Sequence, residues 1–171
     1  MSNKDLVIFA SIISAGLIKP ADYIPCCDEI IVNEEDPSEL IIDLSLMKDE
    51  DAGVKRLLSE AYGNFEEDYP LPDVGFLDVC ASFMKFQSGR ISWETFLRSA
   101  IDVAEHGRCQ WSANDFCRFL DSYMASDSND VLTTNQSQNM AGVLKEDIEE
   151  INFYQEMVKQ RNLTSLLKVR S

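Results

Sequence analysis

The chain has 171 residues, 45% of them hydrophobic and 26% charged, and its 30 acidic and 15 basic residues give a net charge of −15 at pH 7. This apolar fraction supports a folded core and excludes wholesale disorder, while the acidic excess disfavours nucleic acid and anionic membranes as partners, because both recruit Lys and Arg. An odd number of cysteines cannot pair completely, which favours a reducing, cytoplasmic location: Cys26, Cys27, Cys80, Cys109 and Cys117.

The acidic excess is concentrated in the first half of the chain. Residues 1–75 hold 17 acidic and 5 basic residues, a net of −12, whereas residues 76–171 hold 13 and 10, a net of −3. Such a field attracts basic partners and speeds their encounter. Acidic surfaces also keep proteins dispersed, so solubility alone is the competing explanation. We favour a charge-matched partner.

The first element is an apolar run over residues 6–18. Its length fits the core of an export signal, but Asp5 stands at its start and Lys4 is the only base before it, so a buried helix over 3–15 is favoured. Gly16 is placed to end this helix. The run is shorter than the roughly 20 apolar residues that a membrane span needs, and no later segment qualifies.

Two helices are expected next. Pro20 opens the first, because proline fits the first helical turn, and Pro25 is expected to split it, leaving a firmer part over 24–33. The second begins at Asp36 as the cap, with a proline after it and a glutamate three residues on. Residues 40–46 suit a strand by their alternation and a helix by their spacing, and the capping signal favours the helix.

The middle of the chain follows the same pattern. A fourth helix is expected over 51–62 with Gly63 at its end. Residues 64–72 read as a loop, because two prolines and three consecutive acids oppose regular structure. A fifth helix over 72–87 is ended by Gly89.

The last elements are two amphipathic helices, a linker and a long helix. The sixth helix starts at Ser92, carries a regular apolar stripe and stops at Gly107, and the seventh opens at Ser112. Residues 126–140 are polar and rich in Ser and Asn, which predicts a linker. A final helix is expected over 141–161.

Together these elements predict an all-α fold, an antiparallel helical bundle or array of about seven to eight helices. The domain organisation we expect is an acidic helical domain over 1–125, a polar linker over 126–140, and a C-terminal helix within 141–171 packed on the same domain. No internal repeat with a fixed period is present.

Motifs of catalytic and metal sites are absent from the sequence. His106, the single histidine, stands at a helix end, where a surface or capping role is usual; Cys109 is three residues on, but no Cys–His motif surrounds them. The cysteines lack the spacing of a zinc site, residues 49–51 lack the EF-hand pattern, and there is no glycine-rich phosphate loop. We expect no enzyme activity, metal or cofactor.

Three acidic clusters fall at expected turns, where they could form one acidic rim, and aromatic residues flank the third. Turns are commonly charged simply because they are solvated, but three clusters in a half-chain of net −12 favour a binding role. The predicted partner-binding residues are Glu34, Glu35, Asp36, Asp49, Glu50, Asp51, Phe65, Glu66, Glu67, Asp68 and Tyr69.

The stretch Leu57-Leu58-Ser59-Glu60-Ala61-Tyr62, followed by Asn64-Phe65-Glu66-Glu67-Asp68-Tyr69-Pro70, resembles an acidic aromatic segment of small helical immunity proteins. These belong to bacterial contact-dependent inhibition and related polymorphic toxin systems. The resemblance implies a tight complex with one cognate protein toxin, often a basic nuclease. The alternatives are a helical adaptor that binds a partner through an apolar groove, and an enzyme that uses carboxylates or Cys109 and His106.

Overall fold

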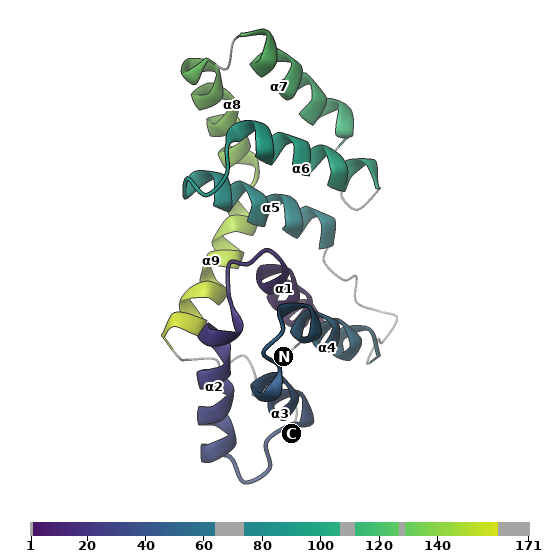
Figure 1. Cartoon of the computed structure of the whole chain (residues 1–171), viewed down its shortest axis with the longest axis vertical. Helices are drawn as coiled ribbons and strands as arrows, with labels where there is room; N and C mark the ends of the chain where they lie inside the picture. Colours follow the sequence, from purple (N-terminus) through teal and green to yellow (C-terminus); the bar gives the residue numbers. More distant parts are fainter. Residues whose placement is uncertain (1, 64–73, 107–111, 127–128, 161–171) are drawn as a thin grey trace. The chain divides into compact units, whose positions relative to one another are not determined.

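The computed structural model of the chain describes residues 2–63, 74–106, 112–126 and 129–160. Within these ranges it contains nine helices and no strand (Figure 1), which confirms the all-α prediction and exceeds the expected number of helices by one or two. The helices are α1 (Asn3–Ser14), α2 (Pro20–Asn33), α3 (Glu39–Leu46), α4 (Glu50–Gly63), α5 (Val74–Gln87), α6 (Trp93–Glu105), α7 (Ala113–Ala125), α8 (Asp130–Val143) and α9 (Lys145–Lys159).

The helices divide into two compact units. Unit 1 contains α1 to α4 and the end of α9 from Ile151, and unit 2 contains α5 to α8 and the start of α9 up to Glu150. The boundary therefore differs from the expected domain over 1–125, because it falls after α4 and again within α9. No helix in the described ranges combines the length and the apolar character that crossing a membrane requires.

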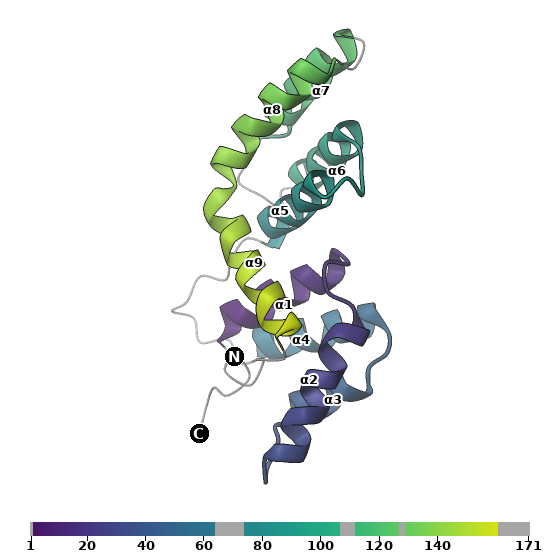
Figure 2. The ribbon, with the colours of Figure 1, turned by 90° about the vertical axis from the view of Figure 1, so that its left-hand side faces the viewer.

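Unit 1 is built around α1. Every residue from Leu6 to Ile13 is buried, and a helix that is buried on all sides is one that neighbouring elements cover completely. α4 lies along α1, α2 packs on α3, and α3 packs on α4 (Figures 1 and 2). The apolar run over 6–18 thus supplies the centre of this unit, as the prediction of a buried first helix requires.

The end of α9 completes the core of unit 1. Ile151, Tyr154 and Val158, spaced three and four residues apart, are all buried. The Tyr154 hydroxyl donates a hydrogen bond to the Asp5 carboxylate, and the Gln155 side-chain amide donates one to the Leu17 carbonyl oxygen at 3.2 Å. This apolar side of α9 therefore packs inside unit 1.

Unit 2 has an aromatic core that one polar side chain completes. Phe83 and Phe96 pack edge to face with their ring centroids 5.3 Å apart, and Trp93 stacks on Phe96 at 5.0 Å. The Trp93 indole NH donates to the Gln136 side-chain oxygen at 2.8 Å, and the Gln136 side-chain NH donates to the Phe119 carbonyl at 3.1 Å. These two bonds explain why a glutamine is buried in the interior.

Several predicted helix ends are confirmed. Gly16 and Gly89 have φ of 65° and 71°, the left-handed conformation that ends a helix, just after α1 and α5. The Ser92 hydroxyl accepts a hydrogen bond from the Thr95 NH at 3.1 Å, which caps α6 as predicted. Gly107 lies outside the described residues.

The predicted split of the second helix at Pro25 is wrong, because α2 runs from Pro20 to Asn33 with Pro25 inside it. Proline removes the NH that would bond to the carbonyl of Ala21. Ala21 is exposed, so water can donate a hydrogen bond to its carbonyl oxygen in place of the missing NH. Tyr23 and Cys26, on either side of the proline, are buried, and their packing holds the helix together.

The third helix begins two residues later than predicted. Ser38, not Asp36, caps α3, and its hydroxyl accepts a hydrogen bond from the Ile41 NH at 3.4 Å. Of the two candidate caps, the structure uses Ser38, which lies closer to the apolar run over 40–46. The choice of helix over strand is correct, because Ile41 and Leu44 are buried three residues apart.

The structure has a helix where the sequence predicts a polar linker over 126–140. Asn129 caps α8 through hydrogen bonds from the NH groups of Val131 and Leu132, and Gln136 and Met140 are buried one turn apart. The pattern was missed because one of its two buried positions is a glutamine. The final helix accordingly begins at Lys145, after Leu144 ends α8.

Candidate partner-binding surface around α3

The first acidic cluster lies in the turn between α2 and α3. Glu34 follows α2 as its C-terminal capping residue and is half-buried, whereas Glu35 and Asp36 are exposed. Neither Glu35 nor Asp36 forms an ion pair with the part of the chain that the structure describes. Among the described residues, these two exposed carboxylates therefore have no cationic partner.

The second cluster lies at the start of α4 and has a structural role as well. The Asp49 carboxylate accepts a hydrogen bond from the Ala52 NH at 2.9 Å, which satisfies one of the donors at the start of α4. Glu50, half-buried, and Asp51, exposed, lie in the first turn, where negative charge suits the helix dipole. Asp51 is thus the member of this cluster most available to a partner.

The two clusters lie at opposite ends of α3 (Figures 1 and 2). Residues 34–36 precede the helix and residues 49–51 follow it, so its eight residues, about 12 Å of helix, separate them. In an array of antiparallel helices, alternate turns lie at the same edge and consecutive turns lie at opposite edges. The turns that hold these two clusters are consecutive. The described clusters therefore border α3 from both ends, which differs from the single rim that the sequence suggested.

The outward side of α3 carries two apolar side chains between these clusters. Leu46 is 73% exposed and Ile42 is 39% exposed, and Glu39 on the same side is also exposed. Ile41 and Leu44 occupy the opposite side and are buried. The helical spacing of this run places Leu40, Ile41, Leu44 and Met47 on one side, and Ile42 and Leu46 lie off that side; the sequence analysis did not single them out as binding residues.

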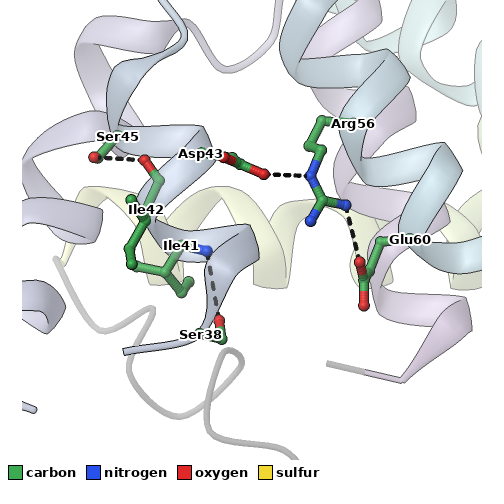
Figure 3. Close-up of polar contacts among 7 residues, drawn as sticks. All are labelled: Ser38, Ile41, Ile42, Asp43, Ser45, Arg56 and Glu60. Atoms are coloured by element: carbon green, nitrogen blue, oxygen red, sulfur yellow. Dashed lines mark hydrogen bonds and ion pairs between the residues drawn. The ribbon is translucent and has the colours of Figure 1, made fainter. Parts of the chain in front are cut away.

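One cation near this surface is held by internal partners (Figure 3). The Arg56 Nε donates to the Asp43 carboxylate at 2.6 Å, and one terminal nitrogen of Arg56 donates to the Glu60 carboxylate at 2.9 Å, which ties α3 to α4. The hydrogen bonds to Asp43 and then Glu60 raise the pKa of Arg56, against the opposing effect of burial. Arg56 therefore neutralises those two acids and not the clusters at the ends of α3.

The third predicted cluster, with Phe65, Glu66, Glu67, Asp68 and Tyr69, lies outside the described residues, so its contribution to binding stays a prediction. Cys109 lies outside them too.

Of the two named residues considered for catalysis, His106 lies within the described residues and Cys109 does not. His106 is the exposed C-terminal capping residue of α6, with its ring Nδ1 2.7 Å from the Asp102 carbonyl oxygen. Burial raises the pKa of the Cys27 thiol to about 12, and burial also raises the pKa of Cys80, so both stay protonated and weakly nucleophilic at neutral pH. Among the described residues, no three His, Cys, Asp or Glu side chains gather closely enough to hold one metal ion.

Comparison of the chain with protein-family models, curated proteins and solved structures finds no match. The surface around α3 and the charge of unit 1 are therefore the features of the chain that bear on its function.

Proposed function

We propose that this protein is a cytoplasmic immunity protein, which binds and neutralises a cognate basic toxin domain through the acidic surface of unit 1. The observation that carries the proposal is the pair of acidic turns at the two ends of α3, in which Glu35, Asp36 and Asp51 are exposed and form no ion pair within the described chain.

The physical logic favours a nuclease as the toxin. A nuclease active site is electropositive because it must hold phosphates. An acidic protein that occupies this site replaces the charge of the substrate. Long-range attraction between the two proteins also raises the association rate, to about 10⁸ M⁻¹s⁻¹ or more at low salt. An inhibitor that must act before the toxin causes damage benefits directly from fast association.

An adaptor that binds a partner helix through apolar contacts alone is the second candidate, and the exposed pair Ile42 and Leu46 could supply such contacts. The final helix is a poor site for such a groove, because Ile151, Tyr154 and Val158 are buried in unit 1. A truncation near residue 126 would remove these core residues, so it cannot separate the two candidates. Charge-reversal variants can separate them.

The test is to co-express the chain with the protein encoded beside its gene and to measure cell survival. We expect the neighbouring protein to be toxic alone and harmless with this chain. A variant with Glu35, Asp36 and Asp51 changed to Lys should lower the association rate of the purified pair by about tenfold at low salt and protect less well. Asp49 stays unchanged in this variant because it caps α4.

The matched control changes three exposed acids of unit 2, Glu105, Asp121 and Glu146, to Lys, which alters the net charge equally. If both triple variants slowed association to the same extent, net charge alone would explain the effect. If neither did, or if binding did not weaken with rising salt, the acidic surface would not be the contact.

A further inference from the structure

The outward side of α3 combines exposed apolar and acidic groups at close range. Ile42 and Leu46 are one helical turn apart, so their side chains are neighbours, and Glu39 lies on the same side. Single exposed apolar residues are common on protein surfaces. Here two share one side of an eight-residue helix, and the opposite side already supplies Ile41 and Leu44 to the core.

The charges in the two segments that directly flank α3 are nearly all of one sign. Residues 34–36 and 49–51 place six acids at the two ends of α3, against one base, Lys48, in the turn between α3 and α4. Arg56 is bound to Asp43 and Glu60 and does not offset these acids. A partner that covers Ile42 and Leu46 must therefore meet negative charge at both ends.

We propose that the outward side of α3 is the docking site for a basic amphipathic helix of the partner protein. Apolar side chains of that helix, one turn apart, pack on Ile42 and Leu46. Its Lys or Arg side chains lie at the two ends, near Glu35 and Asp36 on one side and Asp51 on the other. The inference rests on the proposed function, and it adds that recognition requires an apolar contact as well as charge.

The length of α3 sets the size of the partner segment. A helix that spans about 12 Å and reaches one turn further at each end has about 15 residues. The bases near its ends give long-range attraction, and the apolar pair at its centre gives the contact that excludes water. A basic segment without the apolar pair should reach this surface but bind it more weakly.

The probes are two synthetic peptides of about 16 residues, a length at which an isolated helix begins to be stable. Both carry the same lysines near their ends, and one has two central leucines four residues apart where the other has serines. We expect the chain to bind the leucine peptide about tenfold more tightly than the serine peptide at low salt, because the leucines bury apolar surface on α3.

Leu46→Ser should abolish this preference and leave binding of the serine peptide unchanged. The matched control is Val131→Ser in α8, since Val131 is 68% exposed, close to the 73% of Leu46, and lies in unit 2. It should keep the tenfold preference. Circular dichroism would verify that both variants fold, as expected for changes at exposed positions.

The inference is overturned if wild type shows no preference, if Leu46→Ser retains it, or if Val131→Ser loses it as well. Failure of the proposed function is separately visible in the survival assay. If Leu46→Ser protected cells as fully as wild type while the triple Lys variant did not, the acidic surface would stand and the docking site on α3 would fall.

Discussion

Gly53 provides a sharp test of the packing inside unit 1. A Cβ atom at this position of α4 would lie 2.8 Å from the Tyr23 hydroxyl oxygen and 3.8 Å from the ring carbon that carries it. The first distance is shorter than real Cβ contacts allow. Tyr23 cannot easily move away, because it is completely buried and packs edge to face on Phe9 with ring centroids 6.0 Å apart. Gly53→Ala therefore overpacks this junction.

Two opposing effects determine the size of the change. Alanine gains about 1 kcal/mol over glycine in a helix, and overpacking a rigid site costs about 1–3 kcal/mol. We expect Gly53→Ala to lower the free energy of unfolding by about 1 kcal/mol, measured by urea denaturation. Gly142→Ala in α8 is the matched control, since its added Cβ has no heavy atom within 4 Å apart from its chain neighbours and the backbone of its own helix. It should raise the stability by about 0.5–1 kcal/mol.

The Tyr23 hydroxyl can be removed to test the cause. Tyr23→Phe deletes the atom at 2.8 Å and leaves the ring carbon at 3.8 Å, an ordinary contact. In that background Gly53→Ala should be neutral or stabilising, and the two changes should therefore couple strongly in a double-mutant cycle. If Gly53→Ala stabilised the wild-type chain as much as Gly142→Ala does, the close approach of Tyr23 to α4 would be refuted.

Three further predictions concern unit 2, the buried thiol and the third cluster. Gln136→Ala should cost about 2–3 kcal/mol, because it leaves the buried Trp93 NH without its acceptor, whereas exposed Gln138→Ala should change stability little; equal losses in urea denaturation would refute this role. The pKa of Cys27 is raised from 9.0 to about 12, mainly by burial, so its contribution to stability is full below about pH 9 and is lost as the pH rises to about 12; Cys27→Ala should flatten this part of the stability profile, and an unchanged slope would contradict it. Changing residues 66–68 to Lys should slow association with the basic partner, and an unchanged rate and affinity would remove that cluster from the contact.

The helix ends that could be predicted from the sequence depend on local backbone chemistry. Gly16 and Gly89 adopt a conformation that glycine favours, and Ser92 needs only an NH three residues away. The helix α8 could not be found in this way. Its buried Gln136 is satisfied by Trp93, 43 residues earlier in the chain, so the interaction that makes a polar stretch helical is not visible in the stretch itself.

Only the acidic residues of the candidate surface could be predicted from the sequence, because their placement and the exposure of the apolar pair depend on contacts outside α3. The acidic clusters can be recognised in the sequence as consecutive Asp and Glu residues. Their relative placement, however, depends on which turns they occupy, and consecutive turns lie at opposite ends of a helix. The exposure of Leu46 depends on which side of α3 faces the rest of unit 1. The run 40–46 contains five apolar residues, and an eight-residue helix on a surface cannot bury all of them.

Solubility is the explanation that competes with partner binding, and the placement of the charges separates the two. Net charge keeps a protein dispersed wherever the charges lie, and acids beside exposed apolar residues also protect those residues from self-association. If that protection were their role, the acids would be dispensable in the Leu46→Ser variant, which would stay soluble after Glu35, Asp36 and Asp51 were changed to Lys. The affinity for a basic partner would then be the same with leucine or serine at position 46. If the surface is a docking site, the same serine weakens binding while all the acids remain in place. Leu46 thus decides between protection and recognition, because replacing it with serine leaves the affinity unchanged in the first role and lowers it in the second.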